Sequence, residues 1–274
     1  MSGLSTIFLW ASGGLYVLSG SLYVAFLARE TKRVSAFAPR VLFGGLVFHT
    51  LFLAFRTVES GHFPFADLFE SLCTFVWLVV ALYVFLIERA FKERALGAFV
   101  IPLVALFQLL AIARPSVPTE LEPILQSGWF EVHVSLALLS YASFSLAFVT
   151  GTMYLVQAEL IRSKRVGFVF SRLPSLQLLD AMGYRSVSLG FPALTLAIIT
   201  GSVWASTAWG SFWSWDPKET ATLAMWLFYA AYLHARFVGG WQGRRTAILG
   251  ILGFCLVFVT FLVVGVFLTR IHAF

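Results

Sequence analysis

Eight long apolar stretches, separated by short polar segments, run along the whole chain. They cover about residues 5–28, 40–57, 67–88, 95–113, 131–161, 186–207, 217–238 and 246–269. A helix needs roughly 20 apolar residues to cross the hydrocarbon core of a bilayer. All of its backbone groups must find hydrogen-bond partners within the segment. The pattern therefore predicts an all-α integral membrane protein with about eight transmembrane helices, in a single polytopic domain over 1–274.

One segment between the fifth and sixth stretches breaks this rhythm. Residues 166–183 read VGFVFSRLPSLQLLDAMG, which is too short and too polar to span a bilayer. A segment of this kind is typical of a helix that lies in the membrane interface. We therefore expect an interfacial amphipathic helix at about 166–183.

The composition supports a membrane protein and excludes a soluble one. Hydrophobic residues make up 59% of the chain and charged residues only 12%, whereas soluble domains carry about 25% charged residues. That much apolar surface cannot be buried within the chain alone. Lipid is therefore the expected solvent of the long apolar stretches, and the lipid bilayer is the first partner of the chain.

The charge distribution predicts the topology. The net charge is +6, and fifteen of the nineteen Lys and Arg residues lie in the loops after the first, third, fifth and seventh stretches. By the positive-inside rule these loops face the cytoplasm, so both termini lie outside. The basicity is thus a topology signal, and we expect no nucleic-acid partner.

The N-terminus and the cysteines add two expectations. No charged residue precedes the first apolar stretch, and basic residues follow it, which favours an uncleaved N-out anchor over a signal peptide. Cys73 and Cys255 both lie within predicted helices, and the chain has no CxxC sequence. We therefore expect neither a disulfide framework nor a thiol relay.

The external loop between the sixth and seventh helices has an unusual composition. It reads WGSFWSWDPKET over residues 209–220, with Trp209, Trp213 and Trp215 inside seven residues. Trp residues collect at membrane interfaces, which explains isolated tryptophans elsewhere in the chain but not so dense a cluster. The sequence DPKE also fits a helix start, with Asp216 as the N-cap. We expect a rigid aromatic platform for a flat apolar ligand.

Three of the five histidines are candidate haem ligands. His133 falls at the outer end of the fifth helix and His272 just beyond the outer end of the eighth, on the same face as the tryptophans. His234 falls near the cytoplasmic end of the seventh helix, about 24 Å inward from Lys218. Ionisable residues in a membrane are functional candidates by default, and neutral imidazole is a common haem ligand.

The other two histidines have simpler explanations. His49 lies near the middle of the second helix, and His62 lies in the external sequence ESGHFPFADLFE. A single membrane histidine often forms a hydrogen bond to a neighbouring helix, which we favour for His49. For His62 we favour a role in structuring the loop.

With these residues identified, the chain resembles the CcsA/ResC family of cytochrome c biogenesis proteins, of system II. This family belongs to a wider haem-handling group marked by a tryptophan-rich WWD loop. The resemblance is carried by WGSFWSWDPKETATLAMWLFYAAYLHAR (209–236), ESGHFPFADLFESL (59–72), FEVHVSLALLSYASF (130–144) and His272. It covers essentially the whole chain, with the WWD loop and its following helix at about 204–238. The family more often has Asn at the position of Asp67.

The resemblance implies a haem site with named residues. His133 and His272 correspond to the two external histidines that hold haem iron, beside Trp209, Trp213, Trp215 and Asp216. His234 corresponds to a membrane histidine that helps to hold haem deeper in the bilayer. In the family, its axial partner comes from another subunit, of the CcsB/ResB type.

The resemblance also implies a function. The chain is expected to move haem b across the membrane and present it outside, where thioether bonds form with the CxxCH sequence of apocytochrome c. It supplies no nucleophile of its own, so it is one part of a holocytochrome c synthase, or haem lyase, complex. The bacterial plasma membrane is the favoured location over the thylakoid, with the WWD site on the periplasmic face.

Two other kinds of protein fit parts of the pattern. One is a bis-histidine membrane cytochrome that takes electrons from a quinol, but its histidines usually pair between helices across the bilayer. The other is a haem-free transporter or assembly scaffold, in which the tryptophans form only an interfacial belt. The absorption spectrum of the purified chain, with and without a partner subunit, would distinguish these alternatives.

Overall fold

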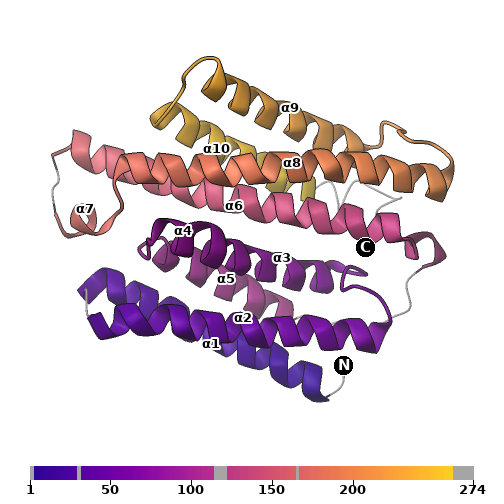
Figure 1. Ribbon diagram of the computed structural model, residues 1–274, viewed down its shortest axis with the longest axis horizontal. Helices are drawn as coiled ribbons and strands as arrows, with labels where there is room; N and C mark the ends of the chain where they lie inside the picture. Colours follow the sequence, from indigo (N-terminus) through magenta and orange to yellow (C-terminus); the bar gives the residue numbers. More distant parts are fainter. Residues whose placement is uncertain (1–2, 30–31, 114–121, 165–166, 262–274) are drawn as a thin grey trace. The chain divides into compact units, whose positions relative to one another are not determined.

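The computed structural model describes residues 3–29, 32–113, 122–164 and 167–261, and these residues form helices and connecting loops without a strand (Figure 1). Each predicted apolar stretch forms a helix in this part of the chain, which confirms the all-α class. The main helices are α1 (Gly3–Arg29), α2 (Lys32–Ser60), α3 (Leu68–Leu82), α5 (Gly97–Ile112), α6 (Gly128–Arg162), α8 (Leu176–Trp209), α9 (Pro217–Phe237) and α10 (Arg244–Phe258). The end of the eighth stretch, 262–269, lies outside the described residues.

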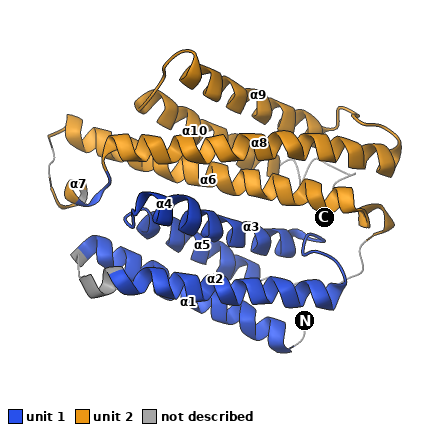
Figure 2. Cartoon of the chain, viewed as in Figure 1, with its two compact units in different colours: residues 1–121, 172–174 blue, residues 122–171, 175–274 orange. Residues whose placement is uncertain are grey.

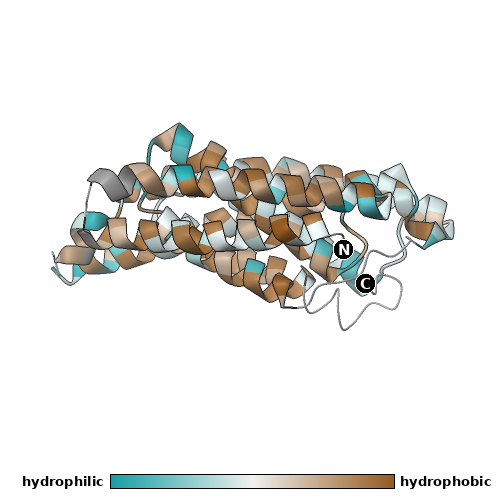
Figure 3. Ribbon diagram, turned by 90° about the horizontal axis from the view of Figure 1, so that it is seen from below, coloured by the Kyte–Doolittle hydropathy of each residue, from teal (hydrophilic) through white to brown (hydrophobic). Residues whose placement is uncertain are grey.

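Six of the described helical segments are long and apolar enough to cross a membrane, so this is a multi-pass membrane protein. They are α1, α2, α6, α8, α10 and the continuous helix that α3 forms with η1 (Tyr83–Glu88) and α4 (Arg89–Phe91). Figure 3 shows apolar residues along most of their lengths. The apolar pattern of the sequence predicted eight membrane-spanning helices. The difference arises because α5 has only 16 residues and because the first and last turns of α9 are polar.

The segment 166–183 does not form one separate helix, contrary to the prediction. A five-residue helix, α7 (Phe168–Arg172), is followed by a break at Pro174. The hydroxyl of Ser175 then accepts a hydrogen bond from the backbone N–H of Leu178 at 3.3 Å. Because this cap starts a new helix, the residues from Leu176 onward belong to the first turns of α8.

The chain divides into two compact units, whereas the sequence analysis treated it as a single domain (Figure 2). Unit 1 comprises residues 1–121 and 172–174, and unit 2 comprises residues 122–171 and 175–274. Within unit 1, α1 packs against α2 and α5, and α3 packs against α5 and α2. Within unit 2, α6 packs against α8 and α10, and α9 packs against α8 and α10.

The core of unit 1 contains polar side chains that satisfy one another. Tyr23 of α1 donates a hydrogen bond of 2.6 Å to Glu88, and the buried Arg56 and Glu70 form an ion pair of 2.6 Å. A buried charge is tolerated in an apolar interior only when it is paired in this way. These pairs tie the helices of unit 1 together without exposing charge to lipid.

The two histidines of unit 1 have the structural contacts that the sequence analysis favoured. His49 is fully buried, and its Nδ1 lies 3.1 Å from the hydroxyl of Tyr16 on α1. His62 has its Nδ1 2.7 Å from the carbonyl oxygen of Phe63, within the loop itself. The first contact joins two helices and the second stabilises a loop.

Unit 2 is held together by close helix approach. A Cβ atom at Gly151 of α6 would lie 2.8 Å from the carbonyl oxygen of Ala247 on α10, so only glycine permits this contact. Small residues allow such approach in membrane helices, where packing rather than the hydrophobic effect drives association. Phe144 and Tyr229 stack with ring centroids 3.6 Å apart, which links α6 to α9. We call the end of unit 2 where α6 begins and α8 ends its loop end.

Candidate functional site: an oriented imidazole beside a tryptophan loop

His133 lies in the second turn of α6, and its imidazole is oriented by α8. Its Nδ1 is 2.7 Å from the carbonyl oxygen of Ala197. A carbonyl oxygen only accepts, so Nδ1 must carry the proton and donate it. In the neutral ring Nε2 then keeps its lone pair. A histidine that donates its other ring N–H to a carbonyl is typical of metal ligands, because this bond sets the tautomer and the ring direction.

The face of α8 opposite His133 is shaped to receive the imidazole. Ala197, Gly201 and Trp204 follow one another at four- and three-residue intervals, so they share one side of the helix. A Cβ atom at Gly201 would lie 2.5 Å from Nδ1 of His133. The Trp204 ring is nearly parallel to the imidazole, at 20° and 6.2 Å between centroids. The pocket for His133 thus depends on the absence of a side chain at Gly201.

Trp204 connects His133 to the tryptophan loop, and the sequence analysis did not include it among the site residues. It is buried, and its Nε1 donates a hydrogen bond of 3.0 Å to the carbonyl oxygen of Ile124. Its ring meets that of Trp209 edge to face, at 5.1 Å and 71°. The sequence did contain a signal for this contact between α6 and α8. Ala197, Gly201 and Trp204 lie on one side of α8, and two small residues followed by an aromatic one are typical of a close helix contact.

The loop itself presents two more tryptophans. Gly210 ends α8 in the left-handed conformation, with φ of +76°, where glycine avoids the penalty of other residues. Trp213 and Trp215 then pack edge to face, at 5.7 Å and 86°. Trp215 is 69% exposed and has φ of +59°. A large residue in this region is strained, and such strain is concentrated at ligand sites.

Asp216 and Glu219 form the capping box that the sequence predicts at the start of α9. Oδ1 of Asp216 accepts hydrogen bonds from the backbone N–H groups of Lys218 at 2.8 Å and Glu219 at 3.4 Å. Oε2 of Glu219 accepts from the backbone N–H groups of Ser214 at 2.8 Å and Asp216 at 3.3 Å. Both carboxylates therefore fasten the loop to the helix. Asp216 is placed here as a cap, beside the tryptophans.

Lys218 brings a positive charge to the same place. It is half-buried, in the first turn of α9. Burial lowers the pKa of the Lys218 amine to about 8, against the opposing effect of the Asp216 carboxylate. In the sequence Lys218 served only as an external landmark.

His234 is not brought together with His133 and the loop. It lies sixteen residues after Lys218 and four residues before Val238, which caps α9. At about 1.5 Å per residue the separation along α9 is roughly 24 Å. The side chain is exposed, while the buried residues of α9 are Met225, Tyr229 and Tyr232. His234 therefore lies toward the far end of unit 2, on the outer face of α9.

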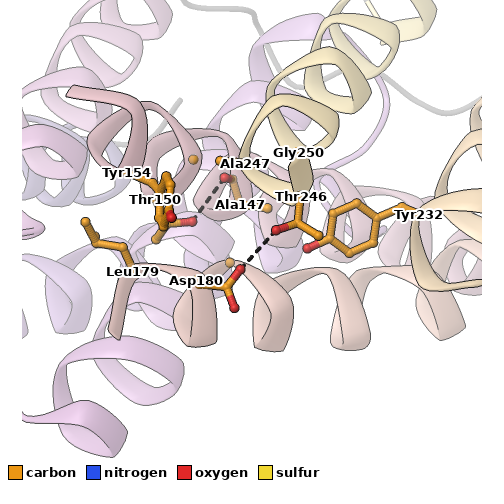
Figure 4. A pocket seen from close by; sticks show the side chains of 11 residues that line it. Ala147, Thr150, Tyr154, Leu179, Asp180, Tyr232, Thr246, Ala247 and Gly250 are labelled. Carbon is orange, nitrogen blue, oxygen red and sulfur yellow. Dashed lines mark hydrogen bonds between the residues drawn. The ribbon is translucent and has the colours of Figure 1, made fainter. Parts of the chain in front are cut away.

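A polar cluster near His234 fixes the far end of α9. Asp180 of α8 receives two hydrogen bonds from Arg236, at 3.0 and 2.8 Å, and a third from Thr246 at 2.9 Å. The backbone N–H of Gly243 adds a fourth at 2.9 Å. Figure 4 shows Asp180 and Thr246 beside a small pocket between α6, α8, α9 and α10. The partners of Asp180 lie 56 to 66 residues further along the chain. This cluster was therefore not predictable from the sequence.

The remaining predicted ligand cannot be placed. His272 lies outside the described residues. Within the described residues, no group of three or more His, Cys, Asp or Glu side chains is arranged to hold a metal ion. A site for a bare metal ion is therefore not found there, whereas a haem iron needs only one or two axial ligands from the protein.

Comparisons with known proteins place the chain among cytochrome c assembly proteins. The family model described as Cytochrome C assembly protein matches residues 65–272. The protein called Cytochrome c biogenesis protein CcsA from Pyropia yezoensis is 37% identical over 266 residues, covering 82% of each chain. The protein of the same name from Synechococcus sp. (strain CC9902) is 36% identical, covering 81% of each.

A solved structure is also similar. The chain called Cytochrome c Heme Lyase CcmF matches with a TM-score of 0.68 and 20% sequence identity, over 97% of this chain. At this identity the likeness shows the fold alone. This chain spans about half of the solved chain, 46% of its length.

Proposed function

Because the chain belongs to the CcsA family of cytochrome c assembly proteins, we propose that it is the haem-handling subunit of a system II cytochrome c synthase. Its role in this proposal is to carry haem b across the membrane. It then presents the haem at the loop end of unit 2 for attachment to the CxxCH sequence of apocytochrome c.

The observation that carries the proposal is the hydrogen bond from Nδ1 of His133 to the carbonyl oxygen of Ala197. It leaves Nε2 as the coordinating atom of a neutral imidazole, the donor that haem iron takes in many proteins. Trp204, Trp209, Trp213 and Trp215 provide aromatic faces and edges beside it. The residues at this end of unit 2 therefore fit a planar apolar ring with an iron atom at its centre.

The second axial ligand of the external site is assigned to His272, on the resemblance noted above. The position of His234 supports a second haem site. A polar imidazole on the outer face of a membrane helix requires a partner, and the described part of unit 2 does not cover this face. A CcsB/ResB-type subunit that brings the other axial ligand would supply that partner.

The chemistry of the chain in this proposal is positioning. When bound, haem b supplies the iron and the vinyl groups that react with the apocytochrome thiols. His133 would hold the iron, the tryptophans would pack against the ring, and the capping box of Asp216 and Glu219 keeps the loop rigid. Holding two reactants in the right orientation lowers the barrier by several kcal/mol. In this proposal the attacking thiolates come from the CxxCH sequence of apocytochrome c, so the chain needs to supply no nucleophile of its own.

The location follows from the topology proposal. With the basic loops in the cytoplasm, the loop end of unit 2 faces the periplasm, or the thylakoid lumen in a photosynthetic cell. The sequence analysis favoured the bacterial plasma membrane. Relatives from cyanobacteria and plastids are compatible with the thylakoid membrane too.

The rival function, a bis-histidine cytochrome that oxidises a quinol, requires two histidines that face one iron within the bilayer. The described histidines of unit 2, His133 and His234, lie toward opposite ends of it.

One experiment distinguishes the two functions. The chain is expressed with a partner subunit and an apocytochrome c, and the covalent haem on the apocytochrome is measured. Covalent attachment that depends on this chain supports the proposal. Reversible haem reduction by quinol without attachment supports the rival.

A further inference from the structure

The inward face of α9 ends in an arginine. Tyr229, Tyr232 and Arg236 follow one another at three- and four-residue intervals, so they share one side of the helix. The two tyrosines are buried in unit 2, and Arg236 continues their side into the last turn of α9. Each residue of an α-helix turns by about 100°, so His234, two positions earlier, projects about 160° away from Arg236. The direction of one side chain therefore fixes the direction of the other.

Asp180 of α8 holds Arg236 in this inward position. Its Oδ1 and Oδ2 accept hydrogen bonds from Nη1 and Nη2 of the guanidinium, at 3.0 and 2.8 Å. The side chains of Arg236 and Asp180 are only 12% and 13% exposed. The ring of Tyr184, one turn after Asp180 on α8, has its centroid 4.3 Å from Cζ of Arg236. Two parallel hydrogen bonds and a ring face restrict the planar guanidinium to one orientation, which the point charge of an ammonium would not require.

Asp180 is itself fixed by the start of α10. Oδ1 also accepts hydrogen bonds of 2.9 Å from the backbone N–H of Gly243 and from the hydroxyl of Thr246 (Figure 4). The turn from α9 to α10 is closed by the backbone N–H of Trp241, which donates to the carbonyl oxygen of Ala235 at 3.0 Å. One carboxylate thus joins α8, α9 and α10 at the far end of α9.

A histidine that ligates a metal needs a fixed direction. The groups that orient such a ligand typically change the metal affinity about 10- to 100-fold when they are lost. His133 receives its direction from a hydrogen bond to the carbonyl oxygen of Ala197. His234 is exposed on the outer face of α9, so the rotation of the helix sets where its imidazole points.

We propose that the ion pair of Asp180 and Arg236 positions His234 for axial bonding to haem iron at the second site. The inference rests on the proposed function and adds two positioning residues to it, which act through the helix and do not touch the haem. With the pair in place, the last turn of α9 keeps one rotation, and the imidazole keeps one direction toward the partner subunit. Without the pair, the end of α9 can turn about its own axis, and the imidazole turns with it.

The test examines the inner haem alone. A complex carrying His133→Gly is purified with the partner subunit, and the spin state of the remaining haem is read from its absorption and EPR spectra. Arg236→Lys keeps the charge and loses the planar fork. It should convert a six-coordinate, low-spin haem into a partly high-spin one and lower the haem affinity about tenfold. Added imidazole should restore the low-spin signal, because the iron lacks only its axial ligand.

The matched control is Arg162→Lys. Arg162 also donates two hydrogen bonds, at 2.9 and 2.8 Å, to one carboxylate, that of Glu159, but this pair lies exposed on α6. The control should leave the spectrum and the affinity of the inner haem unchanged.

Three results would overturn the inference. The first is an unchanged low-spin spectrum and haem affinity in Arg236→Lys, while His234→Ala loses the inner haem; the second haem site then stands without the positioning pair. The second is a high-spin signal that imidazole does not correct, which indicates a disordered site. The third is an unchanged spectrum in Thr246→Val, which removes one bond to Asp180 and replaces Arg236→Lys if that variant does not fold. An inner haem unaffected by His234→Ala would overturn the second haem site of the proposed function as well.

Discussion

Nδ1 of His133 lies 2.7 Å from the carbonyl oxygen of Ala197, sixty-four residues further along the chain. This contact between α6 and α8 leaves one imidazole nitrogen for a ligand. The Trp204 ring lies nearly parallel to the same imidazole, at 20° and 6.2 Å between centroids. The helix packing of unit 2 thus sets the direction of the proposed axial bond.

The first prediction concerns the glycine that makes this contact possible. Gly201→Ala places a Cβ atom 2.5 Å from Nδ1 of His133, so the imidazole must move and lose its orienting hydrogen bond. Loss of such an outer partner typically weakens metal affinity about 10- to 100-fold. The measurement is haem occupancy and the Soret spectrum of the purified complex.

The matched control for this prediction is Gly14→Ala in α1, where an added Cβ meets nothing within 4 Å. This variant should bind haem as the wild type does. Equal haem affinity in Gly201→Ala and Gly14→Ala would show that the position of the His133 ring is not important for binding.

The second prediction separates two tryptophans by their burial. Trp215 is 69% exposed and strained in backbone conformation, so Trp215→Ala should not lower the thermal stability. It should weaken haem holding by about 2 kcal/mol if the ring packs on the porphyrin. Trp209 is half-buried against Trp204, so Trp209→Ala should lower both the thermal stability and the haem affinity. Thermal unfolding and haem dissociation are measured on the same samples. Unchanged haem affinity in Trp215→Ala would leave that residue as an interfacial anchor only.

The third prediction concerns topology. Single cysteines placed near residues 120 and 212 should react with an impermeant maleimide in intact cells, and those near 35, 92 and 242 only after permeabilisation. The reason is the uneven distribution of basic residues. Cys255, which is exposed, is first changed to Ala, whereas Cys73 is buried. Labelling at 212 only after permeabilisation would place the tryptophan loop on the cytoplasmic side and contradict the site assignment.

The fourth prediction distinguishes a carrier from a surface chaperone. His234 lies toward the far end of α9, roughly 24 Å from Lys218 along the helix. If haem passes this residue first, His234→Ala should deplete haem at both sites, because supply to the loop end fails. His133→Ala should leave haem at the inner site. Haem content and cytochrome c maturation are compared in membranes with matched protein levels. Full external haem in His234→Ala would make this histidine a helix-packing residue.

The parts of the structure that depend on neighbouring residues were predictable from the sequence. Long apolar stretches predicted the helices, and the order Asp216, Pro217, Glu219 predicted the capping box because its partners lie within three residues. The boundary at Ser175 was missed because the apolar pattern continues across it. Pro174 and Ser175 were visible in the sequence as a possible break and cap, but the apolar residues on both sides favoured one continuous segment.

The parts that depend on distant residues were not predictable. Trp204 joins the site only because α8 turns that face toward α6, and Asp180 meets Arg236 only because α8 and α9 converge at their far ends. Both relationships span dozens of residues. Aromatic and acidic side chains in apolar helices were visible in the sequence, but their neighbours were not.

The most direct measurement is the absorption spectrum of the complex carrying His133→Gly, purified with its partner subunit, with and without added imidazole. The wild type should show a six-coordinate, low-spin haem at the external site. The variant should lose that signal, because one axial bond is missing, and imidazole should restore it by filling the vacated position. An unchanged low-spin spectrum with full cytochrome c maturation in His133→Gly would contradict the assignment of His133 as an axial ligand.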